Sequence, residues 1–74
     1  MSVHMSELTE LLKTKQVAEN LTGAAMALKL GVSEAMWSYI ASGQRRIGLE
    51  TLQGIVRTWP ELNLQVIEYI RNGN

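Results

Sequence analysis

The sequence has 74 residues, its seven basic side chains are balanced by seven acidic ones, and it contains no cysteine. This length suits one small domain that no disulfide can staple, and a single histidine, His4, is too few for a metal cluster or a histidine-based triad. No apolar run approaches the ~18 residues of a membrane span, and the N-terminus lacks the apolar stretch of a signal peptide, so we expect a cytoplasmic protein without a membrane partner.

The first predicted helix begins after Ser6, whose hydroxyl can cap it. Residues 1–5 show no periodicity, and we interpret them as a flexible start or as residues left from cloning. The helix carries an apolar stripe at helical spacing, made of Leu8, Leu11 and Leu12. We expect it to end near Asn20, because asparagine tolerates a positive φ.

Residues 22–43 have the spacing of two short helices joined by a tight turn, as in a helix-turn-helix. Thr22 can cap the first helix and Ser33 the second, while Gly31 allows the positive φ of the turn. The side chains expected to face the core are Met26, Ala27, Leu30, Met36, Trp37 and Ile40. The opposite side of the second helix is small and polar, with Ala35, Ser38 and Ser42 flanked by Glu34 and Tyr39.

A polar loop at residues 43–48 follows, and two glycines enclose its side chains Gln44, Arg45 and Arg46. A fourth helix is predicted from Leu49 to the residue before Pro60. Its buried side chains would be Leu52, Ile55, Val56 and Trp59. Gly54 inside this helix costs about 0.5–1 kcal/mol relative to alanine, and it could permit a close approach of another helix.

A fifth short helix is predicted after Asn63, which can cap it, and residues 71–74 form a frayed tail. The helix carries more apolar surface than one short helix can bury alone. We therefore predict a dimer interface that consists of Trp59, Leu64, Ile67, Tyr69 and Ile70. The alternative is that this segment only closes the core, where Trp59 would lie together with Trp37.

These elements predict an all-α fold, a single compact five-helix domain over residues 1–74 with a central helix-turn-helix. No strand, repeat or long linker is recognisable. The charges are unevenly distributed, because four basic side chains oppose two acidic ones between Lys29 and Arg57. Neutrality of the whole chain argues against strong non-specific binding to nucleic acid, whereas the basic middle favours some.

Several residues follow one known pattern: Leu21-Thr22, Ala27, Gly31-Val32-Ser33, Ile40, Gly43, Arg45-Arg46 and Leu49-Glu50-Thr51-Leu52. With this pattern the chain resembles the Cro and lambda-repressor helix-turn-helix family, also called the XRE family, from about Leu8 to Ile67. Helix-turn-helix spacing alone has many false positives, but the GxRR loop and the LETL helix make the resemblance more specific. The resemblance implies a lambda-repressor-like fold that binds double-stranded DNA, generally as a dimer.

The resemblance also implies a set of DNA-binding residues. Residues 33–42 correspond to the recognition helix, in which the side chains near bases or phosphates are Ser33, Glu34, Ala35, Ser38 and Tyr39. The loop that contacts the sugar-phosphate backbone corresponds to Gln44, Arg45 and Arg46. Thr22 and Gly23 begin the preceding helix, where the family usually has a phosphate-binding glutamine at the position of Gly23. Glycine leaves only its backbone N–H for this contact.

The recognition helix lacks the arginine, lysine, asparagine and glutamine side chains that make bidentate contacts to bases. Ala35 could pack on a thymine methyl group, Ser38 could donate or accept a hydrogen bond, and Tyr39 could reach a phosphate or a base edge. Glu34 could accept from cytosine N4 or could only stabilise the start of its helix. Partial burial is the alternative for Tyr39, and simple solvation is the alternative for the two arginines.

Two functions remain open at this point. The first is a sequence-specific transcriptional regulator of phage or bacterial type, repressor-like or Cro-like, which binds operator DNA as a homodimer and is associated with the nucleoid. The second is a protein-binding modulator or antirepressor of the same fold, which the neutral charge, the outward Leu28 and the presence of Gly23 favour. No activated nucleophile, carboxylate pair or phosphate-binding glycine loop is recognisable, so we expect no enzymatic activity and no cofactor.

Overall fold

Five α-helices and one 3-10 turn account for most of residues 5–72, which the computed structural model describes. In chain order they are α1 (Glu7–Ala18), α2 (Gly23–Leu30), α3 (Glu34–Ala41), α4 (Leu49–Thr58), the 3-10 turn η1 (Pro60–Leu62) and α5 (Asn63–Asn72). None of the residues between 5 and 72 forms a strand, and the predicted all-α, five-helix fold is confirmed. The interpretation of residues 1–4, including His4, lies outside the described residues.

Hydroxyl side chains cap the first three helices, as predicted. Ser6, Thr22 and Ser33 each accept the backbone N–H three residues further on, at 3.0–3.1 Å. The turns after α1 and α2 contain a positive φ, which is 55° at Asn20 and 75° at Gly31. These boundaries therefore follow from local side-chain and backbone chemistry.

The C-terminal segment differs from the prediction in two places. Asn63 has helical dihedrals, φ −56° and ψ −41°, because η1 leads directly into α5. The prediction that Asn63 caps this helix is therefore wrong. Helix α5 continues to Asn72, so the predicted frayed tail is also wrong for Arg71 and Asn72, while residues 73–74 lie outside the described part.

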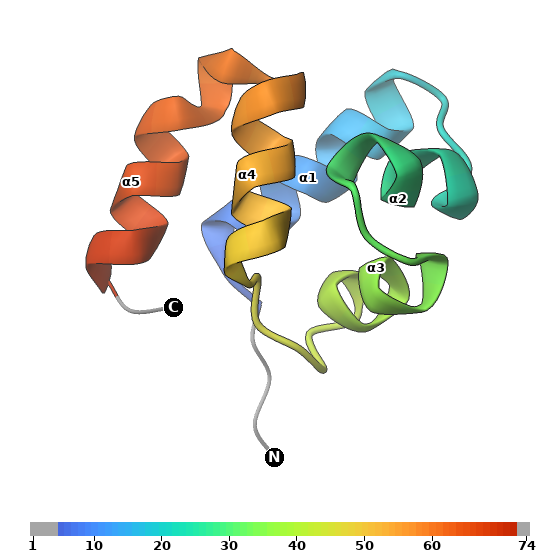
Figure 1. Ribbon diagram of the computed structural model, residues 1–74, viewed down its shortest axis with the longest axis horizontal. Helices are drawn as coiled ribbons and strands as arrows, with labels where there is room; N and C mark the ends of the chain where they lie inside the picture. The colour runs from blue at the N-terminus through green and yellow to red at the C-terminus, as the bar shows by residue number, and fades with distance from the viewer. Residues whose placement is uncertain (1–4, 73–74) are drawn as a thin grey trace.

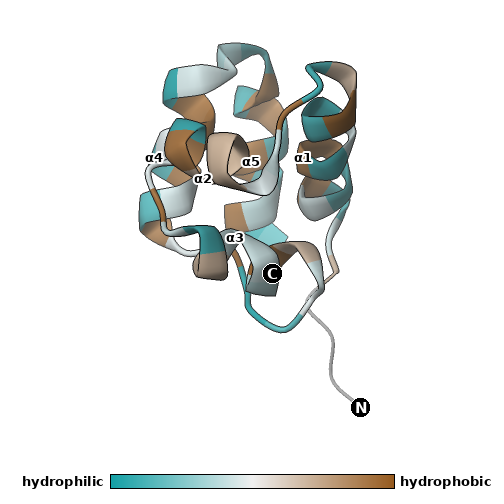
Figure 2. Ribbon diagram, turned by 90° about the vertical axis from the view of Figure 1, so that its right-hand side faces the viewer, coloured by the Kyte–Doolittle hydropathy of each residue, from teal (hydrophilic) through white to brown (hydrophobic). Residues whose placement is uncertain are grey.

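Helix α2 packs against both α3 and α4, and α1 and α5 complete the core around these three helices (Figure 1). Every helix carries hydrophilic and hydrophobic residues (Figure 2), as expected for helices that bury one side. The largest fully buried apolar side chains are Leu12, Met26, Leu30, Ile40 and Ile55. Three side chains that the sequence places in the core are only partly buried at its edge: Leu11, Met36 and Val56. Thr9 and Ile47 are buried although the sequence patterns do not predict it.

Helices α2 and α4 approach each other closely at Gly54. A Cβ atom at this position would lie 2.1 Å from the carbonyl oxygen of Leu30, well inside contact distance. The close approach suggested by the sequence is confirmed, and it explains why a glycine occupies the interior of α4.

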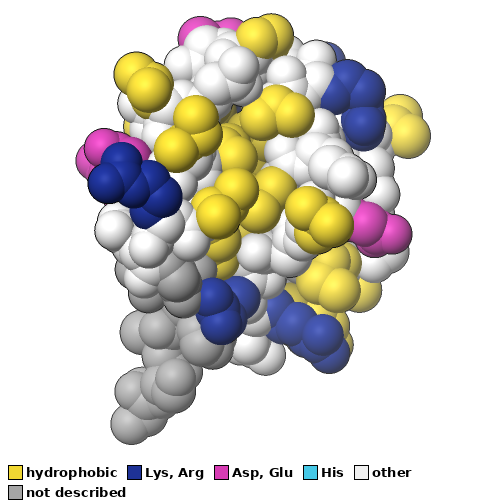
Figure 3. Space-filling view, turned by 60° about the vertical axis from the view of Figure 1, so that its left-hand side comes forward, with side chains coloured by type: hydrophobic (Ala, Val, Ile, Leu, Met, Phe, Trp, Pro, Cys, Tyr) yellow, Lys and Arg dark blue, Asp and Glu magenta, His cyan; other side chains and the backbone are white. Residues whose placement is uncertain are grey.

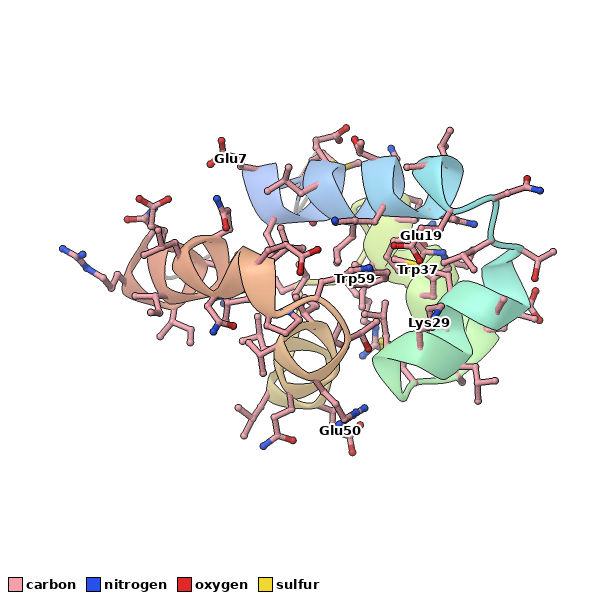
Figure 4. The ribbon with its side chains drawn as sticks, turned by 90° about the horizontal axis from the view of Figure 1, so that it is seen from above. Glu7, Glu19, Lys29, Trp37, Glu50 and Trp59 are labelled. Atoms are coloured by element: carbon pink, nitrogen blue, oxygen red, sulfur yellow. The ribbon has the colours of Figure 1, made fainter. Side chains whose placement is uncertain are left out.

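Both tryptophans are buried, and both tie the C-terminal part of α1 to other elements. The Trp37 indole N–H donates to Gln16 at 3.2 Å, and the Trp59 indole N–H donates to Glu19 at 2.7 Å. Figure 4 shows the two indoles reaching toward this part of α1 from α3 and from the end of α4. These bonds hold α3 and the α4–η1 junction against the same helix.

Candidate functional site

One long side of α3 is open at one end of the molecule. The helix lies below α2 and α4 in Figure 1, and no other helix covers its outer side there or in Figure 2. Its inner side buries Trp37 and Ile40. The side chains predicted for recognition are all exposed: Ser33, Glu34, Ala35, Ser38 and Tyr39. An eight-residue helix of this kind presents a small, polar surface about 12 Å long.

The loop of residues 43–48 is called the arginine loop below. Backbone hydrogen bonds attach its first residues to the end of α3. The backbone N–H groups of Gln44 and Arg45 both donate to the carbonyl oxygen of Tyr39, at 2.8 and 3.2 Å. The guanidinium carbon of Arg45 lies 5.9 Å from the centroid of the Tyr39 ring, within range of a cation–π interaction. The positive charge of Arg45 is thereby held beside the open side of α3, and Arg46 is exposed next to it.

The start of α4 lies directly after the arginine loop. Gly48 is its N-cap, and no side chain accepts a hydrogen bond from the first turn, in contrast to α1, α2 and α3. Val32, Met36, Arg45, Arg46, Leu49 and Glu50 are among the residues that line an open hollow here. The positive end of the α4 dipole and two arginines thus meet at one hollow, where Glu50 supplies one opposing charge. The sequence patterns do not predict this uncapped helix start, although Gly48 before LETL indicates it, because glycine has no side chain to cap a helix.

The start of α2 faces an acidic side chain. A Cβ atom on Gly23 would lie 3.5 Å from a carboxylate oxygen of Glu34, an ordinary contact distance, so this carboxylate lies beside the first residue of α2. Thr22, one residue earlier, is exposed, and its hydroxyl oxygen caps α2. The structure therefore brings the predicted residues of α2 next to those of α3, with a negative charge beside the α2 N-terminus.

The negative charge of Glu34 disfavours the phosphate contact predicted for Gly23. The Glu34 carboxylate interacts favourably with the positive end of the α2 dipole and would repel a phosphate at the same place. Gly23, Glu34 and Ser38 also line an open hollow between α2 and α3. A ligand that presents a hydrogen-bond donor suits this hollow better than an anion does.

The predicted dimer residues divide into two groups. Trp59 and Tyr69 are only 4% and 8% exposed, so the structure corrects their assignment: both lie in the core of the single chain and offer little surface to a second one. The other three form an exposed apolar surface, called the α5 face below, in which Leu64, Ile67 and Ile70 are 72%, 50% and 58% exposed. Figure 3 shows hydrophobic side chains gathered on the side of the molecule that α5 and α4 present, with charged groups at the edges.

Comparison of the chain with family models, with curated proteins and with solved structures found no match. Within the described residues no helix is both long and apolar enough to cross a membrane.

Proposed function

We propose that this protein is a DNA-binding transcriptional regulator that inserts α3 into the major groove of operator DNA. The observation that carries the proposal is the position of Arg45 over the Tyr39 ring, 5.9 Å from its centroid, which places a guanidinium beside the open side of α3. A helix about 10–12 Å across fits a major groove that is about 12 Å wide. Groove walls carry phosphates, so a cation at the edge of the inserted helix is in the right place to bind one.

In this arrangement the two sets of residues have separate tasks. Arg45 and Arg46, together with the uncapped first turn of α4, bind phosphates and set the position of the protein on the duplex. Ala35, Ser38 and Tyr39 lie against base edges. Because these side chains are short or make single contacts, base reading is shallow, and most of the affinity comes from the backbone.

The regulator acts as a homodimer through the α5 face. One domain with few phosphate contacts binds weakly, and two domains on half-sites about 34 Å apart gain affinity by binding together. Leu64, Ile67 and Ile70 supply the exposed apolar surface that such a dimer would bury. A role on operator DNA would associate the protein with the nucleoid.

Ile67→Glu is expected to weaken the dimer, because the interface would bury two unpaired carboxylates. Sedimentation equilibrium over a range of protein concentrations measures this, and we expect at least a tenfold rise in the dimer dissociation constant. Leu28→Glu is the control, since Leu28 is 81% exposed and its helix, α2, lies on the other side of the domain from α5 (Figure 1). A dimer as tight as that of the unaltered chain would remove the α5 face from the interface.

The experiment that tests the function is selection of retained sequences from a random duplex pool at increasing salt. Enrichment of a two-fold symmetric site, with half-sites about one helical turn apart, is the expected result. If duplexes are retained but no sequence is enriched, the protein binds only the DNA backbone. Absence of retention even at low salt would contradict DNA binding.

A second candidate function, a protein-binding modulator or antirepressor, is favoured by Glu34. A carboxylate beside the α2 N-terminus disfavours phosphate and suits a cationic or N–H donor on a partner protein. The highly exposed Leu28 adds apolar surface on α2 for such a partner. In this case the chain would pass through a DNA column at low salt and would be captured by an immobilised regulator.

Glu34→Gln tests whether the Glu34 carboxylate opposes the binding of DNA. For a DNA binder we expect about twofold to fivefold tighter binding, since a carboxylate about 8 Å from a phosphate in water costs roughly 0.5 kcal/mol, and more where water is displaced. Electrophoretic mobility shift at fixed salt measures the change. Glu10→Gln on α1 is the control for net charge and is expected to have a smaller effect. Unchanged or weaker binding in Glu34→Gln would show that Glu34 accepts a hydrogen bond from DNA or takes no part.

A further inference from the structure

The arginine loop is held at both ends by hydrogen bonds to different helices. At its start, the N–H of Arg45 donates to the Tyr39 carbonyl of α3 at 3.2 Å. At its end, the N–H of Ile47 donates to the Tyr69 hydroxyl of α5 at 2.9 Å. Only Arg46 lies between the two attachments. The backbone on the two sides of Arg46 is therefore held by hydrogen bonds to α3 and to α5.

The second attachment is buried, in contrast to the exposed arginines beside it. Ile47 is 4% exposed and Tyr69 is 8% exposed, and the bond between them is shielded from water. A buried N–H that loses its acceptor is costly, so the backbone at Ile47 would have to move toward water if the hydroxyl were absent. Tyr69 and Ile47 are 22 residues apart, and the bond exists only in the folded domain.

We propose that Tyr69 is a positioning residue, which holds the arginine loop in the conformation that binds phosphate by accepting the Ile47 N–H. The inference rests on the proposed DNA binding. Tyr69 itself touches no ligand, because its ring lies in the core and its hydroxyl faces the backbone of the loop. Its contribution is preorganisation: a loop already held in place loses less conformational freedom when the arginines bind.

The positioning role of Tyr69 predicts a specific effect on the salt dependence of DNA binding. Loosening the loop adds an ordering cost to binding, but the number of phosphates neutralised stays the same. Tyr69→Phe is therefore expected to weaken DNA binding about threefold to tenfold, the range of one hydrogen bond, with an unchanged slope of log affinity against log salt. Removal of an arginine would change the slope as well.

The test combines the salt titration with amide hydrogen exchange, which reports on the loop without DNA. In Tyr69→Phe the Ile47 amide is expected to lose at least about tenfold of its protection relative to amides of the core. Thr58→Val is the control, because it also removes one hydroxyl hydrogen bond, an exposed one to the Lys29 carbonyl at 2.8 Å, at the opposite end of α4. It is expected to leave both Ile47 exchange and DNA affinity unchanged. Both variants are compared at a temperature where each is fully folded.

The outcomes are distinguishable. If the unaltered chain binds DNA and Tyr69→Phe binds it as tightly as Thr58→Val does, the positioning role is overturned while the proposed function stands. An Ile47 amide that stays protected in Tyr69→Phe overturns it too. If the unaltered chain does not bind DNA at any salt concentration, the proposed function fails first and the positioning role with it.

Discussion

Gly54→Ala is expected to destabilise the domain strongly. The added Cβ atom would lie 2.1 Å from the carbonyl oxygen of Leu30, 2.6 Å from its carbonyl carbon and 2.9 Å from its Cα. All three are backbone atoms, which cannot turn away as a flexible side chain can. Relief requires α2 and α4 to separate, and their contact forms the centre of the core.

The cost of overpacking at Gly54 exceeds the gain in helix propensity that alanine brings. Alanine gains about 0.5–1 kcal/mol over glycine in a helix, whereas overpacking costs about 1–3 kcal/mol and more when backbone must move. A domain of 74 residues has a total stability of only about 4–11 kcal/mol. Urea denaturation followed by circular dichroism measures the loss, for which we expect more than about 3 kcal/mol.

Gly48→Ala is the control for this prediction. No atom lies within 4 Å of a Cβ placed on Gly48, so the cost is limited to the N-cap preference, about 1 kcal/mol or less. A Gly54→Ala variant as stable as Gly48→Ala would mean that α2 and α4 do not approach as described.

The parts of the fold that could be predicted are those governed by local chemistry. Ser6, Thr22 and Ser33 cap their helices through atoms three residues away, and Gly31 is in the left-handed region that the turn requires. Such signals need no knowledge of the rest of the chain. The exposed side of α3 could be predicted for the same reason, since helical periodicity alone separates it from Trp37 and Ile40.

The parts that could not be predicted depend on contacts between distant segments. Helix α5 is apolar on more than one side, and only its packing against α1 and α4 decides that Tyr69 is buried while Ile67 is exposed. The same holds for Glu34, whose place beside Gly23 depends on how α2 and α3 pack. Periodicity shows which side of a helix is the more hydrophobic, but it does not show which other element packs against each side.

Replacing Arg45 and Arg46 together by alanine is expected to give the largest loss of DNA affinity, provided that the proposed function is correct. A dimer would lose four cations that neutralise phosphates, and each phosphate contact adds about 0.9 to the slope of log affinity against log salt. The slope should therefore fall by about 3 to 4. At about 1 M salt such contacts contribute little. Over the tenfold range from there to about 0.1 M salt, the change in slope lowers the affinity by about a thousandfold to ten-thousandfold.

The loss should be equal for operator and random duplexes, because these contacts read the backbone and no bases. Fluorescence anisotropy at several salt concentrations measures the slope, and circular dichroism verifies that the exposed substitutions leave the fold intact. Lys13→Ala with Lys15→Ala is the control, since it removes the same charge from α1. It also removes the ion pair of Lys15 with Glu61 at 2.7 Å, so circular dichroism must verify the fold of this variant too. If both double variants weaken binding equally, general charge attracts DNA and the arginine loop has no special role. If only the arginine variant lowers the slope, the loop beside α3 is where phosphate binds.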